Sequence, residues 1–155
     1  RTRADGEIEI SSPFLAQGYY REGKLEPLPT QDGFFATGDL GFLEAGRLVV
    51  NGRRTEMIKS GGLKIFPAEI ENALQGFSGL VEAAAFSIPD AEWGEAVCLV
   101  VVGENIDLGK VRGYLEARLD RRKLPKQILL ADELPRSATG KVLRADLRAK
   151  ILGAP

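Results

Sequence analysis

The sequence contains no histidine among its 155 residues. This absence excludes histidine general bases, Ser-His-Asp and Cys-His nucleophile systems, and histidine metal ligands. Its single cysteine, Cys98, allows neither an internal disulfide nor a thiolate zinc cluster. Because Cys98 lies inside an apolar run, we expect it to be an ordinary core residue.

An excess of charge of either sign is also missing. Lys and Arg total 21 and Asp and Glu total 22, for a formal net charge of -1. This balance gives no indication of binding to nucleic acid or to an anionic membrane. The longest apolar run, residues 96–102, is far shorter than the roughly 18 residues of a membrane span and suits a buried strand.

The start of the chain carries no signal-peptide pattern, so we expect a cytoplasmic protein. The first residue is Arg1 rather than Met, and a strand-like pattern follows almost at once. We therefore expect this sequence to be a piece of a longer protein.

Glycine is plentiful, with 18 residues, which indicates tight turns and close backbone approaches. Alternation and apolar runs predict strands over residues 6–10, 41–43, 47–50, 55–58, 81–88, 96–102 and 127–130. Helical spacing and capping signals predict helices over residues 67–75, 108–121 and 143–152. Residues 11–20 and 21–31 are expected to be irregular, and residues 37–39 a turn.

These elements divide the chain into two parts. Residues 52–155 are predicted to form a compact α+β domain of about a hundred residues. Residues 1–51 contain strands and loops and are too few to bury a convincing core alone. We expect them to be the end of a larger domain.

A loop with a conspicuous lysine follows the last predicted strand. In residues 134–144, Thr139-Gly140-Lys141 suggests phosphate binding, but a Walker A loop is excluded because Pro135 and Val142 replace required residues. The loop still presents hydroxyls and a lysine that can act as a mobile point charge on an anionic centre. The alternative is a solvated lysine in a turn.

Two further segments carry candidate ligand-binding residues. Asp39 follows Thr37-Gly38 and is either a turn cap or a carboxylate that faces a diol such as ribose. Arg53 or Arg54 could clamp a phosphate or ribose, or be a solvated surface arginine. Gly61-Gly62 could let a ligand chain pass close to the backbone, or form a plain turn.

Together these segments resemble the adenylate-forming superfamily, which includes acyl-CoA and aryl-CoA synthetases, peptide-synthetase adenylation domains and firefly luciferases. The shared motifs are T-G-D, G-R…I-K-x-G-G…P-x-E-I-E, P-D-x-x-x-G-E at residues 89–95, and P-x-S-x-T-G-K at residues 135–141. Their order and spacing match over residues 6–147.

The resemblance implies the C-terminal portion of such an enzyme. In that family a large N-terminal domain holds ATP and the acid, and a small α+β domain, a short sheet flanked by helices, moves over it. Residues 1–51 would then be the β-rich end of the large domain. Residues 52–155 would be the mobile domain, with a hinge at about residues 52–55. The fragment alone would be inactive.

The resemblance also assigns roles to single residues. Asp39 matches the acid that holds the ribose hydroxyls of ATP and AMP, and Arg53 the arginine on the ribose or phosphate side. Lys141 matches the catalytic lysine of adenylation.

Further matches lie on the side of the domain that the family uses for thioester formation. Gly61 and Gly62 match glycines of the pantetheine tunnel, and Trp93 a position near CoA. Lys59 falls where some relatives have a lysine for the second half-reaction. The hinge position, usually Asp or Lys, is Thr55 here.

The implied function is that of an AMP-forming carboxylic acid–CoA ligase, which uses ATP, Mg²⁺ and CoA, with the magnesium ligands outside this piece. The link at residues 102–108 and the hinge at residues 52–55 look similar to those of o-succinylbenzoate–CoA ligases of menaquinone and phylloquinone biosynthesis. The alternatives are a peptide-synthetase adenylation domain, which passes its acyl group to a carrier protein, and a detached binding domain without catalysis.

Overall fold

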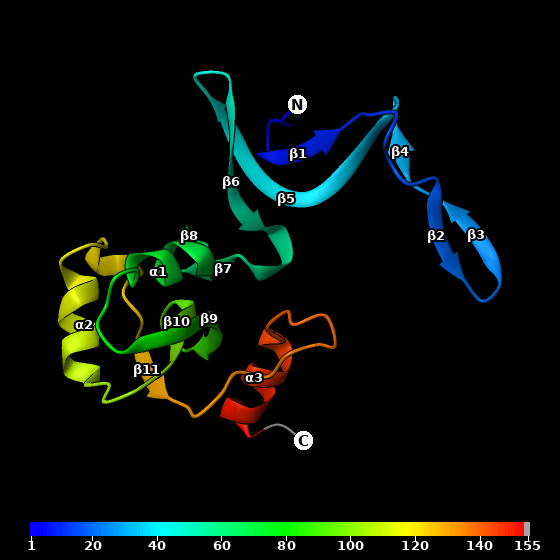
Figure 1. Ribbon diagram of the computed structural model, residues 1–155. Helices are drawn as coiled ribbons and strands as arrows, with labels where there is room; N and C mark the ends of the chain where they lie inside the picture. The colour runs from blue at the N-terminus through cyan, green and yellow to red at the C-terminus, as the bar shows by residue number, and fades with distance from the viewer. Residues whose placement is uncertain (154–155) are drawn as a thin grey trace. The chain divides into compact units, whose positions relative to one another are not determined.

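A computed structural model describes residues 1–153. The chain forms two compact units, Arg1–Thr55 and Glu56–Pro155 (Figure 1). The sequence placed the second domain from residue 52. Gly52 and Arg53 instead complete a strand of the first unit, where they pair with Leu40 and Asp39.

The first unit is built around one long strand, β5 (Phe34–Glu44), which pairs antiparallel with three others. Its partners are β1 (Glu7–Ile10), β4 (Thr30–Gln31) and β6 (Arg47–Arg53). β5 and β6 form a hairpin over the predicted strands at residues 41–43 and 47–50, and both turn residues, Ala45 and Gly46, have the positive φ of a tight two-residue turn.

Residues 18–27 correct the sequence expectation of irregular chain. They form a second hairpin of β2 (Gly18–Arg21) and β3 (Lys24–Pro27). Glu22 and Gly23 both have positive φ and close it with a two-residue turn. Pro27, which suggested an irregular segment, is the last residue of a strand that pairs with one neighbour, where its missing N–H is tolerated.

The second unit has a five-stranded sheet with β10 (Gly94–Gly103) at its centre. One edge of β10 pairs antiparallel with β9 (Leu80–Asp90) along almost its whole length. The other edge pairs in parallel with β11 (Gln127–Leu130). Near Gly94 the same edge pairs antiparallel with β7 (Ile58–Ser60), which in turn pairs antiparallel with β8 (Leu63–Ile65).

Three helices pack on this sheet: α1 (Pro67–Ala73), α2 (Leu108–Glu116) and α3 (Arg144–Leu152). Asp107 caps α2, since its side chain accepts the N–H groups of Gly109 and Lys110 at 2.8 and 3.2 Å. None of the helices among the described residues combines the length and the apolar character that a membrane crossing requires.

Two predicted boundaries in this unit are wrong. The helix predicted over 108–121 ends at Glu116, because Asp120 accepts the N–H of Arg122 and caps a separate 3₁₀ turn, η2 (Arg121–Lys123). The strand predicted over 55–58 is replaced by the 3₁₀ turn η1 (Arg54–Glu56), and β7 begins only at Ile58.

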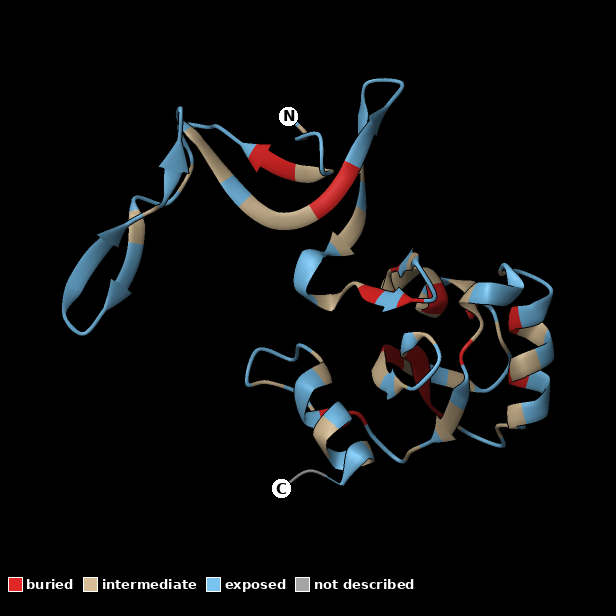
Figure 2. Cartoon of the chain, turned by 180° about the vertical axis from the view of Figure 1, so that it is seen from behind, coloured by how far each residue is buried: buried red, intermediate tan, exposed pale blue. Residues whose placement is uncertain are grey.

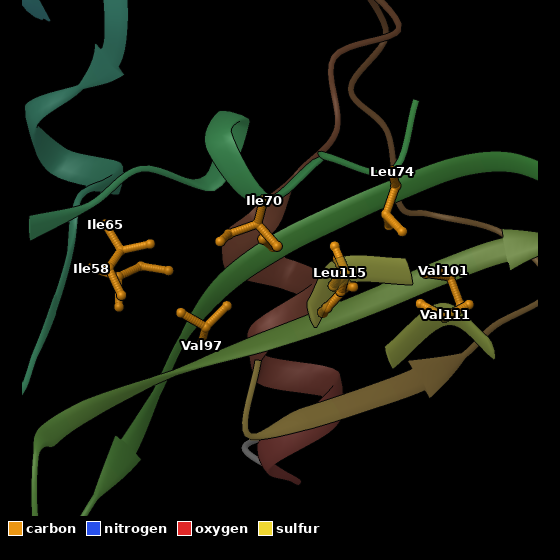
Figure 3. Packing of buried hydrophobic residues seen from close by; sticks show 10 residues of the cluster. Ile58, Ile65, Ile70, Leu74, Val97, Val101, Val111 and Leu115 are labelled. Carbon is orange, nitrogen blue, oxygen red and sulfur yellow. The ribbon is translucent and has the colours of Figure 1, made fainter. Parts of the chain in front are cut away.

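The core of the second unit follows from the alternation of β10. Val97, Leu99 and Val101 face the side chains of α1 and α2 (Figure 3). Cys98, Val100 and Val102 point to the opposite face and pack with Leu147 of α3 and its neighbours. Each such side chain contributes roughly 1.5–3 kcal/mol on burial. The sheet is therefore covered on both faces, and the helices fix the loops at its ends.

Cys98 is fully buried in this core. Burial raises the pKa of its thiol to about 11. The thiol therefore stays protonated and is no nucleophile near neutral pH, in line with the expected core role.

Candidate functional site

Asp39 lies on β5, within a bulge rather than in the turn that the sequence predicted. Glu9 pairs with Ala36 and Glu7 with Leu40, so β5 carries two extra residues between these positions. Gly38 allows the bulge with φ 76°. The Thr37 hydroxyl donates to the Ile8 carbonyl at 2.9 Å and accepts the Asp39 N–H at 3.0 Å. The Thr37 side chain thus ties the bulge to β1 and holds the backbone at Asp39.

Asp39 and Arg53, the two nucleotide-binding candidates, are direct partners across β5 and β6. Arg53 Nε lies 3.0 Å from Asp39 Oδ1, and the side chains remain 54% and 32% exposed. The pair offers a carboxylate for hydroxyl groups and a guanidinium for an anion, side by side and open to solvent.

Arg54, the alternative to Arg53 as a phosphate or ribose ligand, has other partners. It donates to Asp5 at 2.9 Å and to Glu7 at 3.0 Å. The Glu7 N–H and the Arg54 guanidinium together hold the pKa of Asp5 below its usual range. Of the two arginines, Arg53 is therefore the one that accompanies Asp39.

The Lys141 loop is a small hairpin closed by a bridge between Arg136 and Val142. Ser137 N–H donates to the Lys141 carbonyl, and Gly140 N–H to the Ser137 carbonyl, each at 2.9 Å. The Ser137 and Thr139 hydroxyls lie 2.9 Å apart, and Ser137 Oγ also accepts the Lys141 N–H at 3.2 Å. The hydroxyls that suggested phosphate binding thus bond within the loop and shape its turn.

The side chain of Lys141 is held only loosely. Its Nζ lies 3.9 Å from Glu56 Oε1, and 64% of the side chain is exposed. An exposed ion pair at this distance contributes little stability, so the ammonium is free to move to another anion.

Three charged residues beside this loop carry no functional signal in the sequence motifs, namely Glu56, Glu71 and Arg144. Arg144 bonds both carboxylate oxygens of Glu71, at 2.8 and 3.0 Å, and lies 3.4 Å from Glu56. The P-x-E-I-E motif includes Glu71, but nothing in its spacing indicates a partner 73 residues further on.

The residues expected to take part in thioester formation lie together at a second corner of this unit. Gly61 and Gly62, with φ 53° and 80°, form the two-residue turn between β7 and β8. Gly61 N–H donates to the Trp93 carbonyl at 3.1 Å. A Cβ at Gly61 would lie 3.6 Å from the indole, so the ring packs directly over the turn.

The position of Trp93 is fixed by its neighbours. Its backbone N–H donates to Asp90 Oδ1 at 2.9 Å. The Lys126 ammonium lies 4.3 Å from the centroid of the Trp93 ring and 2.6 Å from Asp90 Oδ2. Lys126 and then the Trp93 N–H hold the pKa of Asp90 below its ordinary value. The carboxylate therefore stays ionised and ties Trp93 and Lys126 together.

Lys59 lies on β7 in the same corner, with an exposed side chain opposite Lys64. Its backbone N–H donates to Glu95 Oε2 at 2.6 Å. Thr55, the expected hinge residue, is exposed within η1 and is the last residue of the first unit.

Comparison with known proteins identifies the second unit. Residues 69–141 match the AMP-binding enzyme C-terminal domain family. Over these residues the second unit matches the C-terminal domain of AMP-binding enzymes. This confirms the resemblance carried by the motifs.

The relatives of this chain include CoA ligases. The chain is 44% identical over 149 residues to indoleacetate–CoA ligase of Aromatoleum aromaticum, covering 94% of this chain and 29% of that ligase. It is 38% identical to 2-succinylbenzoate–CoA ligase of Listeria monocytogenes, covering 94% of this chain and 32% of that protein. The chain therefore spans about a third of the length of the relatives it matches.

A solved structure confirms the fold. The o-succinylbenzoate CoA synthetase MenE of Bacillus subtilis, in complex with the intermediate OSB-AMP, matches with a TM-score of 0.83 and 35% identity. The match covers 92% of this chain and 30% of MenE. The predicted fold class, a small α+β C-terminal domain preceded by β strands, is thus correct.

Proposed function

We propose that this chain is the C-terminal part of an ATP-dependent, AMP-forming carboxylic acid–CoA ligase, inactive without the large N-terminal domain. The observation that carries the proposal is Lys141, an exposed ammonium on a loop whose two hydroxyl groups bond within the loop. The relatives named above support CoA, rather than a carrier protein, as the acyl acceptor.

In the first half-reaction the substrate carboxylate attacks the α-phosphorus of ATP. A bond forms between the carboxylate oxygen and phosphorus, and the bond to pyrophosphate breaks. Lys141 stabilises the negative charge on the reacting oxygens, and Asp39 with Arg53 holds the ribose. Among residues 1–153 no group of three or more Asp, Glu or Cys could hold a metal, so no step is assigned here to the Mg²⁺ that accompanies ATP.

In the second half-reaction the thiol of CoA attacks the acyl carbon of the adenylate. The carbon–sulfur bond forms, AMP leaves with the anhydride oxygen, and the thiol proton passes to solvent. We assign this step to the corner of Gly61, Gly62, Trp93 and Lys59, which a rotation about Thr55 would bring into use. A cytoplasmic location, where ATP and CoA are available, is part of this proposal.

The proposal is tested in the full-length enzyme with Lys141→Ala, and the two half-reactions are assayed separately. We expect adenylation, measured as pyrophosphate release, to fall about 10²–10³-fold, as for loss of one preorganised charge at a reacting oxygen. Thioester formation from supplied acyl-adenylate should change little. Lys110→Ala, an exposed lysine on α2, is the matched control. Equal loss of both half-reactions, or no loss in either, would contradict the role of Lys141.

For the acid itself we propose 2-succinylbenzoate, with indoleacetate as the second candidate because the named indoleacetate ligase shares 44% identity with the chain. Pyrophosphate release with each acid, compared with an unrelated short acid, decides between them. Release with neither would exclude both substrates while leaving the reaction type intact.

A further inference from the structure

The loose hold on the Lys141 side chain raises the question of what fixes its backbone. The loop lies between two arginines, Arg136 before Lys141 and Arg144 after it, and both reach back to β9. These two contacts come from opposite ends of the loop and use different partners on the same strand.

The first anchor is Arg136. One terminal nitrogen of its guanidinium bonds Glu82 on β9, and the other donates to the Gly140 carbonyl at 2.6 Å. Gly140 directly precedes Lys141. The guanidinium thus connects the sheet to the peptide bond that carries the lysine.

The second anchor is Arg144, the first residue of α3. Besides its two bonds to Glu71, its Nε donates to the Ala85 carbonyl on β9 at 3.2 Å. Glu71 Oε1 in turn accepts the Ala85 N–H at 2.9 Å. These bonds link α1, β9 and the start of α3. Arg144 and Glu71 are only 22% and 20% exposed, so water screens their pairing less than that of Lys141.

Both anchors depend on the shape of arginine. Each guanidinium bonds two separate groups at once, through nitrogens held in one rigid plane. A lysine would keep the charge but present a single ammonium on a flexible stem, and it would lose the bridge. Arginine-to-lysine changes therefore separate geometry from charge.

We propose that Arg136 and Arg144 are positioning residues that hold the Lys141 loop in place for adenylation. The inference rests on the proposed role of Lys141 and adds to it how the lysine is placed. Lys141 itself supplies the charge, and the two anchors restrict where its backbone can go. Misplacement by about 1 Å can cost about 10²-fold in rate, so loss of either anchor should slow adenylation selectively.

The test uses the full-length enzyme with Arg136→Lys and Arg144→Lys. We expect the kcat of adenylation to fall about 10- to 100-fold with little change in the KM of the acid, because placement of the lysine and not substrate binding is altered. Thioester formation from supplied acyl-adenylate should stay within about twofold. Equal loss in both half-reactions would mean that the arginines only support the fold, and would overturn the inference.

Arg148→Lys is the matched control. Arg148 lies one turn further along α3 and donates to the Ser87 carbonyl of β9 at 2.9 Å, so it makes the same kind of contact away from the loop. We expect near wild-type adenylation. An Arg148 variant as slow as the two anchor variants would overturn the inference, because attachment of α3 in general would then be limiting.

A further comparison places each arginine change in the Lys141→Ala background, with residual adenylation measured in single turnovers. If the anchors act through Lys141, they should have no additional effect there. Full additivity would overturn the inference. If Arg144→Lys fails to fold, Glu82→Gln and Arg136→Lys test the other anchor by themselves. Normal adenylation in Lys141→Ala alone would overturn the proposed function, whereas selective failure of the arginine variants to slow adenylation would overturn only this inference.

Discussion

The two units of the chain bury their side chains in very different ways. In the first unit the buried hydrophobic residues are Ile8 and Leu40, whereas the second unit has a buried cluster on each face of β9 and β10 (Figure 2). The first unit instead leaves large apolar side chains exposed along its β5–β6 hairpin, namely Phe42, Leu43, Leu48 and Val50.

This difference separates backbone pairing from core formation. The strand β5 joins three partners by hydrogen bonds, yet beyond Gly41 no side chains of the first unit bury the apolar residues of its hairpin. Apolar residues on both faces are typical of strands that other elements cover. In the second unit, the helices cover both faces of the sheet and bury its apolar side chains within the unit. We therefore infer that it folds alone, while the first unit depends on further protein.

The largest expected effect comes from separating the two units. Residues 56–155 alone should unfold cooperatively in urea, with a free energy of unfolding of roughly 5 kcal/mol or more. Residues 1–55 alone should show no cooperative transition, because two-stranded hairpins and nearly coreless sheets are marginal in water. Circular dichroism and amide chemical-shift dispersion measure both. A cooperative transition in residues 1–55 would show that the first unit also folds alone.

A smaller effect is expected from a single core side chain of the second unit. Leu99→Ala, at a position with 0% exposure in β10, should lower the free energy of unfolding of residues 56–155 by about 2–5 kcal/mol. Leu130→Ala on the neighbouring β11, at 53% exposure, should change it by less than about 0.5 kcal/mol. Urea midpoints at constant slope give both values. Similar losses for the two variants would show that β10 is not the centre of the core.

The smallest predicted effect tests local structure in the second unit. Asp107→Ala removes the cap of α2 and should cost about 1 kcal/mol of unfolding free energy. Asp107→Ser, which keeps an oxygen for the same N–H groups, should recover most of the loss. If both variants lose stability equally, the side-chain oxygen is not what stabilises the helix end.

Sequence patterns predicted the second unit better than the first. The runs that became β9 and β10 are long and apolar, and α1 begins at the predicted residue, Pro67, which suits the first turn of a helix. The errors lie where short-range signals compete. Pro27 suggested irregular chain where a hairpin forms, and Gly38 indicated a turn where a bulge lies. A 3₁₀ turn at residues 54–56 takes the place of a predicted strand.

The residues of the candidate site were identified by motifs, whereas their contacts came from the structure. Motif order identified Asp39, Arg53, Lys141 and the Gly61-Gly62 turn, and the structure pairs Asp39 with Arg53 and brings Gly61 under Trp93.

The sequence by itself determined the family, the main strands and helices, and which residue types are available for chemistry without histidine. Periodicity, capping and ordered motifs are local, and they can be read along the chain. Only the tertiary structure decided that Glu71 pairs with Arg144, that Arg136 connects Glu82 to Gly140, and that Arg54 turns away from Asp39. These contacts join residues up to 73 positions apart, and their partners are set by how helices and strands pack, which no local pattern specifies.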